Sequence, residues 1–288
     1  MLAIRITSHP FSIVYAMGNS STSSSFETLL VTRDNGIVTV TMNRPSKKNA
    51  ANVTMWAELL AVFREVGTNE QDRVMVLTGA GEAFCSGADL GGRKSGGTPE
   101  PRANQSRHAS MRLLADVCNA LARIPQPTIA KVRGVAVGAG CNMALICDLV
   151  VASDNARFSE IFSKRGLSLD FGGSWVLPRR IGLHRAKELA FFADIIGADE
   201  AERIGLVNRV VADAQLDAFV SDWAARLAAG PPIALAHTKR LLNNSANVTL
   251  EEALDDESAA QVINFGTKDI VEAMSAFIEK REPRFTGR

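Results

Sequence analysis

The 288-residue chain has almost no net charge and few cysteines. Its 32 lysines and arginines balance 31 acidic residues to a net charge of +1, which argues against a strongly basic surface for nucleic acid. The four cysteines form no Cys-x-x-Cys pair, a pattern typical of reduced thiols inside a cell. No apolar run reaches the roughly 18 residues that a membrane span requires. We therefore expect a soluble, cytoplasmic protein that contacts neither nucleic acid nor membrane.

Several catalytic signatures are also missing. Gly138 and Gly140 lack the third glycine of a dinucleotide-binding fingerprint. There is no G-x-x-x-x-G-K-S/T phosphate loop and no G-x-S-x-G turn around a nucleophilic serine. The four histidines stand apart from one another and from the cysteines. The sequence thus predicts neither a metal site nor a serine hydrolase.

Residues 1–26 differ in composition from the rest of the chain. Their apolar stretch is broken by Ser8, His9 and Pro10, and a serine-rich segment follows. We expect a disordered leader rather than a secretory signal. The serine content and the absence of acidic residues before Glu27 also suggest a transit peptide, but the single arginine, Arg5, makes that indication weak. Translation from Met17 is a further alternative.

Two glycine-rich turns are the most informative feature of the sequence. They are F-C-S-G-A-D-L at 84–90 and G-V-A-V-G-A-G-C-N at 134–142, and they follow apolar strand-like runs at 74–79 and 127–132. Small residues let the backbone N–H groups of such turns approach a ligand closely. The second turn leads into a short predicted helix over 142–147, whose free N–H groups and dipole would face an anion. The two turns together predict an oxyanion hole.

The remaining pattern alternates strands with helices. A hairpin with its Asp-Asn-Gly turn at 34–36 opens the ordered part, and the chain is mostly helical from residue 185 onward. Between these come a helix over 51–66 and further strands over 128–137 and 149–152. This alternation predicts an α/β layered fold. We expect a core domain over 27–200 and a C-terminal helical region over 201–288.

A series of motifs runs along the chain in a specific order. Besides the two turns, they are V-T-M-N-R-P-S-K-K-N-A at 40–50, C-D at 147–148, A-R-F at 156–158, G-G-S at 172–174, G-L-V-N at 205–208 and A-F-I-E-K-R-E-P-R-F at 276–285. Over residues 27–285 this set resembles the crotonase family, the enoyl-CoA hydratases and isomerases.

The resemblance has consequences for fold, assembly and substrate. It implies an α/β crotonase-like spiral of ββα repeats with a C-terminal helical trimerisation region, assembled as a homotrimer or hexamer. It implies an acyl-CoA thioester substrate and no resident cofactor, because coenzyme A is part of the substrate. The backbone N–H groups of Ala88 and Ala139 would hold the thioester oxygen and stabilise the enolate.

The resemblance also suggests contacts to coenzyme A, at Lys47, Lys48, Asp89, Leu90, Phe277 and Lys280. The first two precede a segment that lines the coenzyme A path in the family, and the next two lie in the first turn near the adenine. The last two would come from a neighbouring subunit. A flexible ammonium makes only a diffuse phosphate contact, so an ordinary solvated surface remains an alternative for the two N-terminal lysines.

The acid–base groups depart from those of the hydratases. One hydratase glutamate directly follows the cysteine of the second turn, where this chain has Asn142. The other lies four residues after the phenylalanine of A-R-F, where this chain has Phe162. Neither an amide nor a phenyl ring does acid–base work at neutral pH. The two-glutamate hydration mechanism is therefore in doubt.

Asp170 occupies the position of the catalytic acid in related isomerases, four residues after Gly166. One carboxylate suffices for a 1,3-proton shift, because the group that removes a proton from one carbon can return it to another. The alternative interpretation is a turn or helix-cap aspartate, since the F-G-G-S sequence follows it.

Three more residues complete the candidate pocket. Glu160 could replace a missing acid, although we expect a strand glutamate that points outward. Asn142 is expected to be structural, or to donate a hydrogen bond that holds water or the acyl group. Phe162 and the polar loop at 91–102 are expected to shape and close the acyl pocket.

The sequence thus favours an acyl-CoA isomerase that uses Asp170, with Ala88 and Ala139 as the oxyanion hole. A hydratase with atypical acids is a close variant. A non-catalytic acyl-CoA-binding protein is the alternative from another class, and it gains if Asp170 points away from the pocket.

Overall fold

The computed structural model describes residues 26–89 and 107–288. Its main sheet has six strands in the order β1-β2-β3-β4-β6-β9. The first two strands are antiparallel and every later neighbouring pair is parallel. The bounds are β1 (Leu29–Asp34), β2 (Ile37–Met42), β3 (Val74–Gly79), β4 (Thr128–Val132), β6 (Leu149–Ser153) and β9 (Arg209–Val211).

The hairpin between β1 and β2 has the predicted turn. Asn35 and Gly36 both have positive φ, 50° and 78°, and Asp34 pairs with Ile37 across the turn. Two consecutive left-handed residues match the right-handed twist of the flanking strands, which is why an Asn-Gly pair suits this position.

The predicted strand over 128–137 is wrong as one element. Gly134 has a φ of 59°, and a Cβ atom at this position would lie 1.9 Å from the backbone oxygen of Glu82. This glycine breaks the strand, and the second half, β5 (Val135–Val137), enters a separate sheet with β7 (Arg157–Ser159) and β8 (Ile196–Gly197). The break directs the end of β5 toward the first glycine-rich turn.

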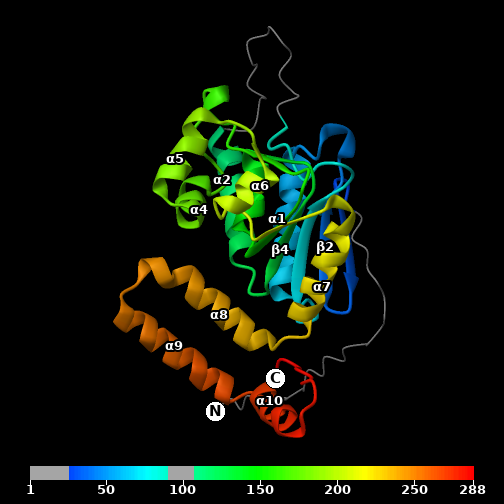
Figure 1. The fold of residues 1–288 in the computed structure, drawn as a ribbon, viewed down its shortest axis with the longest axis vertical. Coiled ribbons are helices and arrows are strands. Elements are labelled where there is room, and N and C mark those ends of the chain that lie inside the picture. The colour runs from blue at the N-terminus through cyan, green and yellow to red at the C-terminus, as the bar shows by residue number, and fades with distance from the viewer. Residues whose placement is uncertain (1–25, 90–106) are drawn as a thin grey trace, which may run out of the picture.

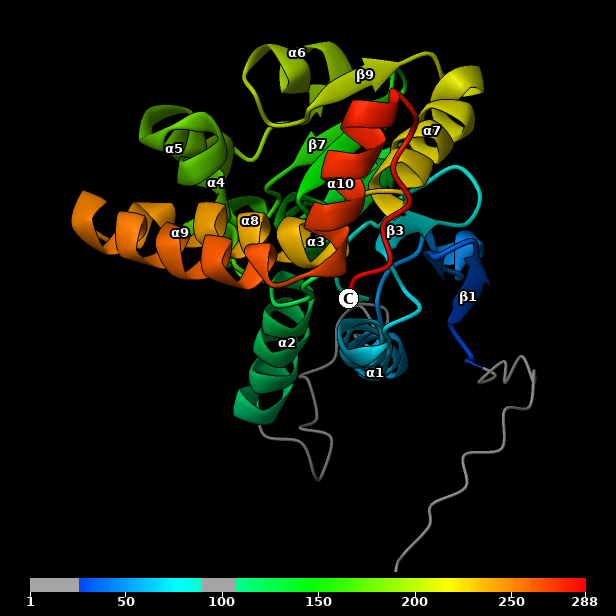
Figure 2. The ribbon, with the colours of Figure 1, turned by 90° about the horizontal axis from the view of Figure 1, so that it is seen from below.

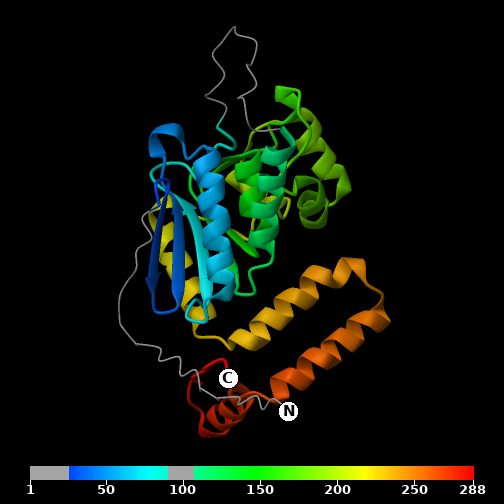
Figure 3. The same cartoon turned by 180° about the vertical axis from the view of Figure 1, so that it is seen from behind.

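Helices cover both faces of the main sheet. The helix α1 (Val53–Thr68) packs beside α2 (Arg107–Ala122) on one face, and α7 (Leu216–Ala228) covers the other, as Figures 1 and 3 show. Met75 and Leu77 belong to the core beneath α1, whereas Val74 and Val76 pack with α7. Burial on both faces explains why β3 reads as a continuous apolar run rather than an alternating one.

The helices α3 (Ala139–Ile146), α4 (Gly173–Ile181), α5 (Leu183–Phe192) and α6 (Ala198–Arg203) lie around the smaller sheet. Short 3-10 turns stand between several elements, at η1 (Pro45–Lys47), η2 (Ser163–Arg165), η3 (Asp213–Gln215) and η4 (Ser245–Asn247). The helical content expected after residue 185 is confirmed.

The C-terminal part is a helical extension. The helices α8 (Pro232–Asn244) and α9 (Leu250–Phe265) form a pair below the core, and α10 (Lys268–Glu279) lies at the end of the molecule opposite α5 (Figure 1). Seen from below, α10 crosses the end of the sheet (Figure 2). Arg73, directly before β3, donates a hydrogen bond of 2.7 Å to the backbone oxygen of Phe285. The C-terminal segment therefore lies at the amino ends of the strands.

The domain boundary expected at residues 200 and 201 stays a prediction. Beyond it, β9 still adds a strand to the main sheet, and α7 still packs on that sheet. The expected leader and the loop at 91–102 lie outside the described residues. None of the helices in the described part of the chain is long and apolar enough to cross a membrane.

Candidate active site

The two glycine-rich turns lie side by side at the carboxyl ends of β3 and β5. Cys85 pairs with Ala136 in a parallel backbone bridge. The N–H of Cys85 donates to the backbone oxygen of Val135, and the backbone oxygen of Cys85 accepts from the N–H of Val137, both at 3.0 Å. A Cβ atom on Gly140 would lie 2.3 Å from the backbone oxygen of Cys85. Only glycine lets the two backbones approach this closely.

Three residues beyond that bridge, the two turns reach Ala88 and Ala139. The N–H of Ala51 donates to the backbone oxygen of Gly87 at 2.8 Å, and its backbone oxygen accepts from the N–H of Asp89 at 2.9 Å. The intervening N–H, that of Ala88, therefore points away from Ala51. Ala139 is the first residue of α3, where an N–H has no partner within the helix. Neither N–H donates to another backbone group within residues 26–89 and 107–288. Both are available to a ligand oxygen.

The helix α3 adds its dipole to these two N–H groups. Its amino terminus begins at the second turn, and its carboxyl end is met by Arg180, which donates to the backbone oxygens of Leu145 at 3.1 Å and Cys147 at 2.9 Å. The guanidinium compensates the negative end of the helix, while the positive end stays directed at the turn. This end of α3 favours a negatively charged oxygen.

Asp170 lies in the segment between η2 and α4, directly before a strained turn. The buried Phe171 has a φ of 46° and Gly172 a φ of 76°. A left-handed conformation is rare for a bulky residue and persists only where the surroundings impose it. Here the ring of Phe171 packs on Trp56, with 5.5 Å between the centroids. This contact fixes the turn that carries Asp170.

The helix-cap interpretation of Asp170 is wrong. The N-cap of α4 is Gly172, and no side chain makes a cap hydrogen bond there. Asp170 Oδ1 is buried and has no hydrogen-bond partner among the described residues. Burial raises the pKa of this carboxyl to about 6. A carboxyl group held without a partner in a partly dry environment is suited to proton transfer near neutral pH.

The expectation that Glu160 points outward is also wrong, because its exposed fraction is 1%. It stands two residues after the buried Phe158, so the strand alternation places both side chains on the same, interior face. Burial is the largest cause that raises the pKa of Glu160 to about 7, and the charge of Asp170 raises it further. Contacts with Cys141 and Asn142 act in the opposite direction.

The side-chain amide of Asn142 links the residues Glu160 and Asp170 by donating a hydrogen bond to each. Its Nδ2 donates to the backbone oxygen of Asp170 at 2.9 Å and to Glu160 Oε2 at 3.3 Å. The amide lies flat against Gly173, where a Cβ atom would be 2.5 Å from Nδ2 and 2.8 Å from Oδ1. The sequence reading missed Gly173, although the G-G-S motif marked its position.

Phe162 is a buried wall of the second turn rather than an acid. Its ring comes within 3.6 Å of the place where a Cβ atom on Gly138 would stand. The side chain therefore contributes apolar surface beside the amino terminus of α3.

The expected coenzyme A residues fall into separate groups. Lys47 and Lys48 are exposed, and their backbone oxygens accept hydrogen bonds from Ser86 in the first turn. Asp89 forms an ion pair of 2.8 Å with Arg44, so its carboxylate fixes the turn. Leu90 lies outside the described residues.

Phe277 and Lys280 lie on or just after α10, at the opposite end of the strands from the two turns. The side chain of Phe277 is 81% exposed. A single chain does not bring these two residues to the turns, and their contribution from a neighbouring subunit stays a prediction.

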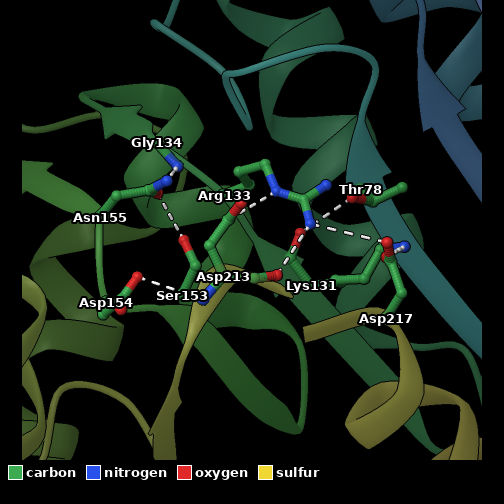
Figure 4. A network of polar contacts seen from close by, with 9 residues as sticks. All are labelled: Thr78, Lys131, Arg133, Gly134, Ser153, Asp154, Asn155, Asp213 and Asp217. Atoms are coloured by element: carbon green, nitrogen blue, oxygen red, sulfur yellow. Dashed lines mark hydrogen bonds and ion pairs between the residues drawn. The ribbon is translucent and has the colours of Figure 1, made fainter. Parts of the chain in front are cut away.

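Another polar network, drawn in Figure 4, joins the sheet to η3 and α7. Arg133 pairs with Asp213 at 2.7 Å, and Lys131 pairs with Asp217 at 2.5 Å. Because its cations and carboxylates compensate one another, this network is suited to holding the layers together rather than to chemistry.

The cysteines do not form a second reactive centre. All four are free thiols, and burial raises the pKa of Cys85 and Cys147 to about 12. Within the described residues, no cluster of three or more His, Cys, Asp or Glu side chains could hold a metal. The absence of a metal or cofactor stays a prediction.

Comparison with known proteins agrees with this arrangement. Residues 32–288 match the enoyl-CoA hydratase/isomerase family. The 1,2-epoxyphenylacetyl-CoA isomerase of Escherichia coli K12 is 38% identical, over 88% of this chain and 97% of its own. The short-chain-enoyl-CoA hydratase of Clostridium acetobutylicum is 36% identical, over 88% of this chain and 95% of its own.

Solved structures show the same fold. The enoyl-CoA hydratase of Bacillus anthracis superposes with a TM-score of 0.83 at 31% identity, covering 91% of this chain and all of that one. The enoyl-CoA hydratase of Mycobacterium smegmatis gives a TM-score of 0.81 at 36% identity, covering 90% of this chain and 98% of that one. The mixed α/β architecture with its helical C-terminal region is thus the expected crotonase fold. The chain belongs to the enoyl-CoA hydratase/isomerase family.

Proposed function

We propose that this enzyme isomerises an unsaturated acyl-CoA thioester, with Asp170 as the single acid/base. The observation that carries the proposal is the state of Asp170, a partly buried carboxyl with a raised pKa and an unpartnered oxygen. Asn142 ties the backbone of Asp170 to the first turn of α3. The proton-transfer group and the anion-binding helix end thus share one rigid support.

The proposed reaction moves one proton and the double bond, and it adds no atom to the acyl chain and removes none. The N–H groups of Ala88 and Ala139 donate to the thioester oxygen, and Asp170 removes a proton from the acyl chain. The negative charge develops on the oxygen, where the two N–H groups and the α3 dipole stabilise it. Asp170, whose O–H proton can exchange with solvent at this stage, then delivers a proton to another carbon, which shifts the double bond.

Coenzyme A would bind across the first turn. Lys47 and Lys48 offer exposed ammonium groups beside this turn for the phosphates, and the backbone around Asp89 and Leu90 would meet the adenine. Phe277 and Lys280 would act from a neighbouring copy, because the chain's own α10 lies at the other end of the strands.

The self-associating surface for that neighbour is the C-terminal helical region. Large apolar side chains there are exposed, among them Leu250, Val262, Phe265, Val271, Phe277 and Ile278. A monomer rarely exposes so many apolar groups together. We propose a homotrimer or hexamer in which these side chains become buried.

Hydration is the second candidate, and one observation favours it. Glu160 is a second carboxyl near Asp170, and the charge of Asp170 helps to raise the pKa of Glu160. However, Asn142 stands between the two acids and Glu160 is 1% exposed.

The test follows deuterium by mass spectrometry. The purified protein is incubated in heavy water with a 3-enoyl-CoA and, separately, with a trans-2-enoyl-CoA, with Asp170→Asn in parallel. We expect double-bond migration with deuterium in the acyl chain, and a loss of roughly 10²- to 10⁴-fold in the variant. A 3-hydroxyacyl product that persists in the variant would establish hydration instead. Tight ester binding without turnover would establish a binding protein.

A further inference from the structure

Three buried polar atoms near the proposed acid/base have no hydrogen-bond partner among the described residues: Asn142 Oδ1, Glu160 Oε1 and Asp170 Oδ1. An unpaired buried polar atom costs roughly 1–3 kcal/mol, so a cluster of such atoms requires an explanation. Asp170 is the group expected to meet substrate. Asn142 and Glu160 lie behind it, and the two are hydrogen-bonded to each other through their other atoms.

The orientation of the Asn142 amide is fixed by its two acceptors. Nδ2 has two hydrogens, and they are directed to the backbone oxygen of Asp170 at 2.9 Å and to Glu160 Oε2 at 3.3 Å. Reversing the amide would set an oxygen against two other oxygens. Oδ1 therefore requires a donor, and Glu160 supplies one only if its carboxyl carries a proton.

The surroundings of Glu160 contain no compensating positive charge in the described part of the chain. The small cavity beside it is lined mainly by apolar side chains, among them Leu177, Leu189, Ile196 and Leu206 from α4, α5, β8 and the segment after α6. Ser159 also lines it, and its hydroxyl donates to the backbone oxygen of Ala193 at 3.1 Å. The titratable groups that face it are the Cys141 thiol and the carboxyl of Asp170. An isolated carboxylate in such a site is strongly disfavoured, and a second carboxylate nearby disfavours it further.

We propose that Glu160 acts as a neutral carboxylic acid that positions Asp170 through Asn142. Its O–H donates to Asn142 Oδ1 while Asn142 Nδ2 donates to Glu160 Oε2, so that acid and amide form a cyclic pair. One proton thereby satisfies two of the three orphaned oxygens. The second hydrogen of Nδ2 stays on the backbone oxygen of Asp170, which also accepts from Gly173 at 3.0 Å. Glu160 is a positioning residue, and its role in turnover rests on the proposed function.

The proposal gives the reaction an alkaline limit. Asp170, with a pKa of about 6, must be ionised to remove a proton, so activity rises as the pH passes this value. Glu160, with a pKa of about 7, must stay protonated, so activity falls as it ionises and releases the amide. The profile of kcat is therefore bell-shaped, and its two apparent pKa values belong to the coupled pair.

The first experiment observes the proton directly and requires no turnover. Infrared spectra of the full-length protein at pH 6 are compared for the wild type, Glu160→Gln and Asp170→Asn. We expect a carboxylic-acid carbonyl band that disappears in Glu160→Gln and persists in Asp170→Asn. Wild-type and Glu160→Gln spectra without this difference would overturn the proposal, because the orphaned oxygens would then require a bridging water and an ionised Glu160.

The second experiment measures the pH dependence of double-bond migration. Glu160→Ala leaves the amide unsupported, and we expect kcat to fall roughly ten- to a hundredfold, as misplacement of a catalytic group by about 1 Å does. Glutamine can form the same cyclic pair without a titrating proton, so Glu160→Gln should rescue most of that loss and remove the alkaline limb. A glutamine variant as inactive as the alanine variant would mean that Glu160 itself transfers protons, which overturns the positioning role.

The two experiments separate the failure of this inference from the failure of the proposed function. If the wild type does not isomerise either ester, the proposed function is wrong, while the infrared comparison still decides whether Glu160 is protonated. Circular dichroism and thermal melting identify a variant that fails to fold, and the glutamine variant, which keeps the size and hydrogen bonds of the site, provides the decisive comparison.

Discussion

Asn142 Nδ2 lies 2.9 Å from the backbone oxygen of Asp170. This single hydrogen bond joins two segments that are 28 residues apart and ties the proposed acid/base to the helix whose amino terminus is proposed to bind the thioester oxygen. A family position that carries an acid in hydratases thus serves here as a fixed amide donor. The neighbouring glutamate, two residues after Phe158, supplies the buried carboxyl instead.

Removing the N–H of Ala139 should reduce catalysis without unfolding the protein. Replacing Ala139 by lactic acid changes the amide to an ester and removes this donor, and we expect kcat to fall roughly 10²- to 10³-fold with KM less affected. The ester also makes the carbonyl oxygen of Gly138 a weaker hydrogen-bond acceptor, and this oxygen accepts from the backbone N–H of Asn142.

The matched control places the same ester at Leu250. Leu250 is the first residue of α9, as Ala139 is of α3. The backbone oxygen of the preceding Thr249 accepts from the N–H of Ala253, just as that of Gly138 accepts from the N–H of Asn142. Equal losses of activity at Ala139 and Leu250 would contradict an oxyanion role for the first.

Gly173→Ala should displace the Asn142 amide, because a Cβ atom would lie 2.5 Å from Nδ2. We expect a loss of about 1–3 kcal/mol in the free energy of unfolding and a fall in kcat beyond what this instability explains. Denaturant titration and steady-state kinetics measure the two effects.

Gly67→Ala is the control, because this helical glycine has room for a methyl group: outside its own helix backbone, the nearest atom to the added Cβ is one of Pro125, at 3.7 Å. It should be neutral or slightly stabilising. An unaltered kcat in Gly173→Ala would refute the role of the amide in holding Asp170.

The stability of the fold should depend on pH through Glu160. Its folded-state pKa, about 7, is raised above the ordinary value of 4.5, so the folded state binds the proton more tightly than the unfolded state. The resulting stabilisation is complete below pH 4.5 and is lost as the pH rises to about 7. We expect the wild type to lose about 3 kcal/mol or less across this window relative to Glu160→Gln. Parallel unfolding curves at all pH values would refute the raised pKa.

Charge in the exposed apolar surface of α9 should disrupt assembly. Val262 is 72% exposed, and Val262→Glu should shift the protein toward smaller species in light scattering coupled to gel filtration. Gln215→Glu, at an exposed position in η3 and not on α9 or α10, introduces the same charge and should leave the size unchanged. A wild type that is already monomeric would contradict the proposed oligomer.

The sequence by itself determined the local elements of this protein. The Asn35-Gly36 turn, the fully apolar run of β3 and the helical spacing after residue 185 each follow from backbone preferences or periodicity within a few residues. The motifs also placed Asp170, Asn142 and Phe162 at family positions, because such motifs preserve the order of residues along the chain.

Only the tertiary structure decided what these residues meet. The break at Gly134 depends on the backbone of Glu82, which is distant in sequence, and the burial of Glu160 depends on helices that pack over β7 and the segment after it. The raised pKa of Asp170 likewise comes from burial, which is a property of the assembled layers. Desolvation and hydrogen-bond partners arise from segments brought together by folding, and no local pattern of residues encodes them.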